Sequence, residues 1–266
     1  MKKVKKMKHF GILIILGLLI NVSSLINGCG TSEIEKKELL IYCGITMIKP
    51  MSDIARIIEK QENCTITIVK GGSGNLLRSI KANNVGDLYL PGSDSYIKKC
   101  LKEGIVNDTV FVGHNKAAIM VQKGNPKGIT SDLNNFLKKD YYTVICNPDS
   151  GSIGKETKKI FEKRGIYKDV LDNVHELTTD SKDLVLVLKD KKADLVINWY
   201  ATSQWPENEP YVDVLLVSED FAGKKKLVLG LLKTSKYPEI ARAFMTHAAS
   251  GKGQALFKKY GLYDAG

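Results

Sequence analysis

The sequence lacks the clusters of cysteine and histidine on which metal centres and thiol catalysis depend. It contains five cysteines but no C-x-x-C pair, and spacings of 21, 36 and 46 residues separate Cys43, Cys64, Cys100 and Cys146. Structural zinc sites and redox motifs need ligands only a few residues apart. We therefore expect neither a metal cation nor a cofactor. Apolar runs end at Cys43 and at Cys146, which favours buried thiols over disulfides.

Motifs of two large enzyme classes are also missing. The chain has no G-x-S-x-G pentapeptide of the kind that carries a hydrolase nucleophile. Residues 151–155 resemble part of a phosphate-binding P-loop, but that motif needs Gly where Asp149 stands and Ser or Thr where Glu156 stands. These absences predict that the protein is not an enzyme, and an exported enzyme is the weakest alternative.

Acidic residues are missing from the start of the chain. No acid precedes Glu33, whereas five lysines lie between Lys2 and Lys8 and an apolar run follows over residues 10–22. This pattern is typical of a secretory signal and is short for a membrane-spanning helix. Without a leader ending at Gly28, the formal net charge of +11 falls to +6, from 35 basic and 29 acidic residues. A surface this mildly basic, with lysine clusters that flank turns, argues against nucleic-acid binding.

Residues 25–29, Leu-Ile-Asn-Gly-Cys, resemble the lipobox of bacterial lipoproteins. The resemblance implies a signal peptide over residues 1–28, acylation of Cys29, and a lipidated tether over residues 29–37. Acyl chains hold a protein on a membrane because each buried CH₂ contributes about 0.8 kcal/mol. We therefore expect a lipid-anchored protein on the extracytoplasmic (periplasmic or outer) face of the cell membrane. The alternative is that residues 10–22 remain as an uncleaved anchor helix.

The rest of the chain alternates between strand-like and helix-like segments. Such alternation predicts an α/β fold with two lobes, each a mainly parallel sheet flanked by helices. We assign residues 39–113 plus 226–266 to the first lobe and residues 114–225 to the second. Strands are expected over residues 38–43, 64–70, 87–90, 116–121, 142–146, 193–198, 211–218 and 226–232. Helices are expected from Thr46 to about residue 58, from about residue 76, and over 94–102, 131–138, 154–163, 180–189, 239–244 and 254–259.

Four loops that lead into expected helices are rich in Ser, Thr and Gly and contain no Lys or Arg. They span residues 44–47, 72–75, 149–154 and 178–181, and Thr46 is expected to cap the first of the helices. A helix N-terminus offers unpaired N–H groups and about half a positive charge, to which Ser and Thr add hydroxyl donors. A single loop of this kind could simply cap its own helix. Four of them favour one shared site for a small anion.

These loops resemble those of the periplasmic molybdate-binding proteins of ABC importers, within the two-domain solute-binding superfamily. Residues 41–47 and 51–55 are similar to the first strand, anion loop and helix of that family, with Thr46 at a family Ser position. Residues 72–76 match the second Ser-containing loop, which implies that Ser73 is a ligand. Residues 193–198 are similar to a later strand that a ligand Tyr usually follows. Trp199 stands there instead, so either its indole N–H or Tyr200 takes that role.

The resemblance implies a type II periplasmic binding protein fold with the ligand in a cleft between the lobes. The residues that it assigns to an oxyanion, rather than to a metal cation, are Thr46, Met47, Ser73, Gly74, Ser152, Ile153, Ser181 and Trp199. It implies a monomer that delivers molybdate or tungstate to a membrane permease and its ATPase. The alternatives are another oxyanion such as sulfate or phosphate, a small organic solute, or a role as an anion sensor.

Overall fold

The computed structural model describes residues 36–262, which belong to one compact unit. The expected signal peptide and Cys29 lie outside the described residues. Within residues 36–262, no helix has the length and apolar character needed to cross a membrane. Lys37, expected as the end of the tether, is already the first residue of a strand.

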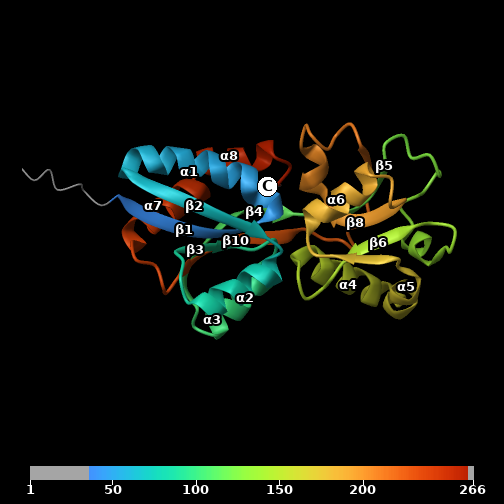
Figure 1. The fold of residues 1–266 in the computed structure, drawn as a ribbon, viewed down its shortest axis with the longest axis horizontal. Coiled ribbons are helices and arrows are strands. Elements are labelled where there is room, and N and C mark those ends of the chain that lie inside the picture. Colours follow the sequence, from blue (N-terminus) through green and yellow to red (C-terminus); the bar gives the residue numbers. More distant parts are fainter. Residues whose placement is uncertain (1–35, 263–266) are drawn as a thin grey trace, which may run out of the picture. The chain divides into compact units, whose positions relative to one another are not determined.

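Two five-stranded sheets organise the chain (Figure 1). The first has the order β2-β1-β3-β10-β4 and the second β7-β6-β8-β5-β9. The strands of the first sheet are β1 (Lys37–Gly44), β2 (Cys64–Gly71), β3 (Leu88–Leu90), β4 (Val106–Asn115) and β10 (Lys225–Leu232). Those of the second are β5 (Ala117–Gln122), β6 (Thr143–Cys146), β7 (Glu176–Thr178), β8 (Leu195–Trp199) and β9 (Val212–Leu215).

The α/β fold with two helix-flanked sheets is confirmed, and both sheets are mixed. In each, three strands run parallel, and the remaining strands add antiparallel pairs. The reason is the route of the chain, which leaves the first sheet along β4, enters the second directly at β5, and returns along β10. Parallel neighbours need a crossover connection, and these passages between sheets provide none.

Helices cover both faces of each sheet. In the first, α2 (Ser73–Asn83) and α3 (Asp94–Lys102) lie on one face (Figure 1). The other face carries α1 (Ile48–Glu62), α7 (Pro238–Ala249) and α8 (Gly251–Lys259). The second sheet packs against α4 (Ser152–Arg164), α5 (Tyr167–Asn173) and α6 (Ser181–Lys189). Three short 3₁₀ helices complete the described elements: η1 (Ile45–Met47), η2 (Leu133–Leu137) and η3 (Tyr200–Gln204).

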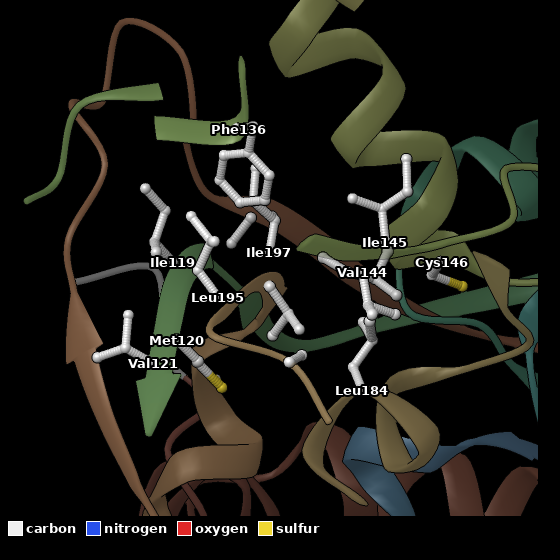
Figure 2. Packing of buried hydrophobic residues seen from close by; sticks show 14 of the residues in the cluster. Ile119, Met120, Val121, Phe136, Val144, Ile145, Cys146, Leu184, Leu195 and Ile197 are labelled. Carbon is white, nitrogen blue, oxygen red and sulfur yellow. The ribbon is translucent and has the colours of Figure 1, made fainter. Parts of the chain in front are cut away.

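Each sheet has its own apolar core. Figure 2 shows part of the core of the second sheet, with Phe136 on the side of Ile119 and Leu195 and with Leu184 beside Val144. Such burial contributes roughly 1.5–3 kcal/mol for each large apolar side chain. All four described cysteines are buried free thiols, and burial raises the pKa of Cys146 to about 12. They are core residues without nucleophilic character.

Some local expectations were wrong. Residues 131–138 form the 3₁₀ helix η2, whose cap Asp132 accepts a hydrogen bond from the Asn134 N–H, rather than an α-helix. Thr46 does not cap α1, because it lies within η1 and its hydroxyl is 2.7 Å from Met47 Sδ. Strands β4 and β7 and helix α5 were not anticipated. β4 has a half-buried stretch without clear alternation, which hides the period of a strand.

Candidate functional site

A small pocket lies where strand ends from both sheets meet helix starts. For brevity, residues 36–115 and 225–262 are called the first-sheet side, and residues 116–224 the second-sheet side. The first-sheet side contributes the loops that follow β1, β2 and β3, and the second-sheet side contributes the starts of α4 and α6 and the end of β8. The lining residues are Gly44, Ile45, Thr46, Gly71, Gly72, Ser73, Gly92, Gly151, Ser152, Ile153, Asp180, Ser181 and Trp199.

Three helices that begin at this pocket start with serine. Ser73, Ser152 and Ser181 are the first residues of α2, α4 and α6, and each follows an extended cap residue. The first N–H groups of a helix have no partner inside the helix. The Ser150 carbonyl accepts hydrogen bonds from two N–H groups of α2, and the Asp180 carboxylate accepts from two N–H groups of α6. The backbone N–H groups of the three serines and of Ile153 have no such acceptor among residues 36–262, so they are available to a ligand.

Two of the serine hydroxyls already accept a hydrogen bond, which leaves their own protons to donate. Ser73 Oγ accepts from the Gly92 N–H at 3.0 Å, and Ser152 Oγ accepts from Trp199 Nε1 at 3.2 Å. Because a hydroxyl has one proton and two lone pairs, both groups are left as donors toward the pocket. Thr46 Oγ1 is held by Asn115 Nδ2 at 3.3 Å, and that amide also donates to the Gly92 carbonyl at 3.1 Å.

The pocket has little formal charge. Asp180 is the only ionisable residue among those that line it in the described part of the chain. Its carboxylate faces the backbone N–H groups of Lys182 and Asp183, and burial raises its pKa. Positive potential comes instead from the N-terminal ends of α2, α4 and α6. Hydroxyls and amides of this kind suit a compact anion that loses its water shell.

Glycines allow the two sides to approach closely at the pocket. A Cβ atom on Gly72 would lie 2.5 Å from the Ser150 carbonyl oxygen, and one on Gly74 would lie 2.1 Å from that of Asp149. A Cβ on Gly92 would lie 2.2 Å from Ser152 Oγ. All three approaches join the first-sheet side to the second-sheet side. Any side chain at these positions would force the sides apart.

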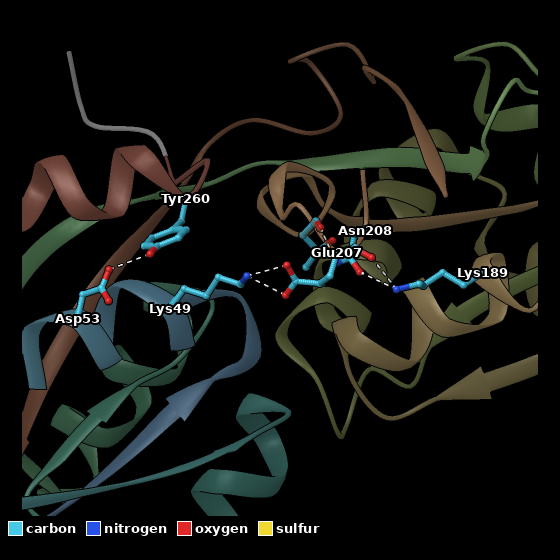
Figure 3. Close-up of polar contacts among 7 residues, drawn as sticks. Lys49, Asp53, Lys189, Glu207, Asn208 and Tyr260 are labelled. Atoms are coloured by element: carbon cyan, nitrogen blue, oxygen red, sulfur yellow. Dashed lines mark hydrogen bonds and ion pairs between the residues drawn. The ribbon is translucent and has the colours of Figure 1, made fainter. Parts of the chain in front are cut away.

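Two sets of polar contacts hold the first-sheet side and the second-sheet side together. In the first set, the N–H groups of Gly74 and Asn75 donate to the Ser150 carbonyl at 2.9 and 3.2 Å, and Arg78 Nη1 donates to the Asp149 carbonyl at 2.9 Å. In the second, Lys49 Nζ of α1 pairs with the Glu207 carboxylate at 2.7 Å (Figure 3). The volume of the small pocket is ≈ 10 Å³, about the space that one water requires.

The structure brings together six of the eight residues that the sequence assigned to the anion: Thr46, Ser73, Ser152, Ile153, Ser181 and Trp199 line the pocket. Met47 is fully buried in the core of the first sheet, and the Gly74 N–H is used by Ser150, so neither of them lines it. Tyr200, the alternative to Trp199, begins η3 and does not line the pocket either.

Sequence reasoning gave no role to several lining residues that have no hydroxyl. Gly44, at the end of β1, and Asp180, just before α6, lie in the loops expected at the anion site, whereas Gly92, which follows β3, was missed. The Pro91-Gly92 pair after an expected strand was a usable signal, because Gly there permits a close backbone approach. Asn115, which fixes Thr46 and Gly92, had no signal in the sequence.

The sequence relationship agrees with this geometry. The profile described as bacterial extracellular solute-binding protein matches residues 39–263, and the chain belongs to that family. A Haemophilus influenzae protein, provisionally described as a binding protein, is 26% identical over 247 residues, or 93% of this chain and 98% of its own. Bacillus subtilis YvgL, provisionally described as an ABC transporter substrate-binding lipoprotein, is 25% identical over 255 residues, or 89% of this chain and 90% of its own.

Solved structures share the fold at low sequence identity. The periplasmic molybdate-binding protein of Azotobacter vinelandii superposes with a TM-score of 0.72 at 13% identity, covering 84% of this chain and 98% of that one. The sulfate-binding protein SubI of Mycobacterium tuberculosis superposes with a TM-score of 0.74 at 15% identity, covering 86% of this chain and 87% of that one. At these identities the likeness establishes the fold.

Proposed function

We propose that the protein captures a tetrahedral oxyanion, with molybdate or tungstate as the first candidates, and delivers it to an ABC importer. The observation that carries this proposal is the donor set of the small pocket. Hydroxyls of Ser73 and Ser152 and free amides of Ile153 and Ser181 converge there, and no Lys or Arg lines it among the described residues. Because a cavity of ≈ 10 Å³ holds about one water, the two sides must separate to admit a tetrahedral oxyanion. Neutral donors that close on the anion fit one radius and leave gaps or clashes at another, so they select by size.

Protonation distinguishes the candidate anions further. Asp180 at the pocket offers an acceptor and a negative charge, and no base other than this carboxylate lines the pocket in the described part of the chain. Its oxygen Oδ1 is occupied by the start of α6, at 2.7 Å from the Lys182 nitrogen. Both N–H bonds go to Oδ1, so Oδ2 is the one carboxylate oxygen left to accept the proton of hydrogen phosphate. The serine hydroxyls and helix-start amides are donors, which suit fully deprotonated anions such as molybdate, tungstate and sulfate.

Calorimetric titration of residues 31–266 with molybdate, tungstate, sulfate and phosphate tests this proposal. We expect tight binding of molybdate and tungstate and no heat from phosphate. Tight binding of sulfate alone would keep the mechanism and change the cargo. No heat with any of the four would overturn the oxyanion proposal and favour an organic solute.

We further propose that Cys29 carries the lipid that keeps the protein at the membrane. The motif at residues 25–29 supports this, and the relative YvgL is itself described as a lipoprotein. Cys29→Ser should abolish both membrane association and the mass increase from acylation. Unchanged membrane association with unchanged mass would instead identify residues 10–22 as an uncleaved anchor.

A further inference from the structure

A second, larger pocket lies next to the small one and shares Ile45 and Ser181 with it. Its cavity of ≈ 290 Å³ is of the size that small organic ligands occupy. Residues of both sides line it: Ile45, Ile48, Lys49 and Lys70 from the first-sheet side, and Ser181, Lys182, Val185, Leu186, Lys189, Thr202, Trp205, Glu207 and Asn208 from the second-sheet side. The oxyanion proposal gives this pocket no role.

The walls of the larger pocket are mainly apolar. Val185 and Leu186 line it from α6, and Ile48 lines it from the start of α1. Leu186 is 40% exposed, which leaves an apolar side chain in contact with water unless a ligand covers it. These side chains can hold the organic body of a ligand, which the hydroxyls and glycines of the small pocket cannot.

The charges around the larger pocket are strongly unbalanced. Four lysines line it against the single acid Glu207. Lys49 is paired with Glu207, and Lys189 Nζ donates to the Glu207 carbonyl at 2.7 Å (Figure 3). The side-chain ammonium groups of Lys70 and Lys182 have no hydrogen-bond or close ion-pair partner among residues 36–262, and the Asp180 carboxylate is the acid that interacts electrostatically with Lys182. Lys70 comes from the end of β2 and Lys182 from the start of α6, so an anion between them would meet both sides.

Trp205 supplies an independent sign of an incomplete site. The side chain lines the pocket at 8% exposure, and its Nε1 is buried without a hydrogen-bond partner among the described residues. Buried donors almost always have acceptors. Lys49 Nζ lies 5.0 Å from the centre of the same ring. This contact keeps the indole at the seam, the zone where the first-sheet side meets the second-sheet side.

We propose that the larger pocket is a second binding site, for a small organic anion with an apolar body. The body packs against Val185, Leu186 and Trp205, and a carboxylate or phosphate group lies between Lys70 and Lys182. The walls come from both sides of the molecule, so this site is complete only when the two sides are in contact. We call that state the closed arrangement. A ligand that binds only the closed arrangement favours closure. Occupancy of the larger pocket therefore strengthens oxyanion capture, and the reverse holds by the same factor.

The coupling rests on the proposed oxyanion function, whereas the second site itself does not. Calorimetry on the full mature protein should use two acids, indole-3-acetate and phenyl phosphate, with indole-3-acetamide as the uncharged match of the first. We expect at least one acid to bind, and to bind at least tenfold more tightly than the amide. Saturating molybdate should tighten that binding at least twofold.

The variant Lys70→Gln with Lys182→Gln should weaken binding of the acid at least fivefold and leave molybdate binding within twofold. Leu186→Trp, which fills the pocket from an exposed position, should abolish acid binding. The matched control is Lys102→Gln with Lys252→Gln, at two exposed lysines outside the pocket. A crystal structure with the bound acid should show its anionic group between Lys70 and Lys182.

Absence of binding heat from both acids would overturn the second site. So would equal affinities for the acid and the amide, or an affinity for the acid that the Lys70→Gln/Lys182→Gln variant leaves unchanged. Acid binding without any molybdate binding would leave the second site standing and reject the oxyanion proposal. Binding of both ligands without mutual tightening would reject only the coupling.

Discussion

The two adjoining pockets share Ile45 and Ser181 yet differ in almost every physical property. The small one, ≈ 10 Å³, is lined by glycines, hydroxyls and helix starts, with Asp180 as its only ionisable residue among those described. The larger one, ≈ 290 Å³, has apolar walls and four lysines. A flexible lysine adapts to anions of many shapes, whereas fixed amides accept few. The comparison shows how one seam can combine a site that selects anions by size with a site that accepts anions of many shapes.

The largest effect should come from a change that opens the seam and so damages both pockets. Gly74→Ala places a methyl group where Asp149 O is 2.1 Å away, and the backbone of both residues is fixed by the Ser150 contact. Overpacking of this kind costs roughly 1–3 kcal/mol. We expect molybdate affinity to fall about 5- to 150-fold, measured by calorimetry, and organic-anion affinity to fall with it.

Gly251→Ala is the matched control, since nothing lies within 4 Å of a Cβ atom at this helix start. A cost of roughly 1–3 kcal/mol is smaller than the about 5–15 kcal/mol by which folded domains are usually stable, so neither variant should unfold the protein. Wild-type affinities for both ligands in Gly74→Ala would show that the seam tolerates a wider gap and that closure does not form the sites.

The second prediction separates the pockets. Thr46→Ala with Ser73→Ala removes two hydroxyls from the small pocket and none from the larger. Loss of the Ser73 hydrogen bond to the anion, at roughly 1.5–3 kcal/mol, together with loss of the hydroxyl that Asn115 holds at the pocket wall, should weaken molybdate binding at least tenfold. Organic-anion affinity, measured in the absence of molybdate, should stay within twofold.

Thr67→Ala with Ser218→Ala makes the same chemical change at exposed positions and should leave both affinities unchanged. If the Thr46→Ala/Ser73→Ala protein binds molybdate as the wild type does, the anion site lies elsewhere.

The expected helix starts could be read from the sequence because local chemistry produces them. Ser73, Ser152 and Ser181 each precede a helix-period apolar pattern, and each indeed begins a helix at the pocket. The residues that signal a helix start lie within a few positions of it, so the short loops that contain these serines and glycines are enough to predict it. The prediction that Thr46 caps α1 was wrong, because Thr46 lies within η1, which precedes the first residue of α1, Ile48.

Features that depend on long-range docking could not be read in this way. Gly92 meets Ser152, which is 60 residues further along the chain, only after the two sheets approach. The orientation of Trp199, whose indole faces Ser152 rather than open space, depends on the same packing. The larger pocket also escaped notice, since its lysines are scattered over α1, β2 and α6 and form no motif.

The third prediction tests whether Trp199 acts on the anion directly or through Ser152. Trp199→Phe keeps an aromatic ring and removes the N–H that donates to Ser152 Oγ at 3.2 Å. A neutral hydrogen bond contributes roughly 0.5–1.5 kcal/mol, so molybdate affinity should fall about 2- to 12-fold. In a double-mutant cycle by calorimetry, the same change should have little effect once Ser152→Ala is present. An undiminished loss in that background would place the indole N–H on the anion itself.

The smallest expected effect concerns the ion pair that borders the larger pocket. Burial raises the pKa of Glu207, but the hydrogen bond from Lys49 and the nearby ammonium groups outweigh it, so the net shift is downward. A lowered pKa stabilises the folded protein above the ordinary Glu pKa, and this stabilisation disappears as the pH falls through the lowered value. Because the Glu207 side chain is 53% exposed, screening limits the effect to less than about 1 kcal/mol. Glu207→Gln should therefore lower the Tm by at most about 2–4 °C at pH 7, and the difference from wild type should vanish in acid. A difference that grows on acidification would show that the Lys49–Glu207 pair does not stabilise the seam.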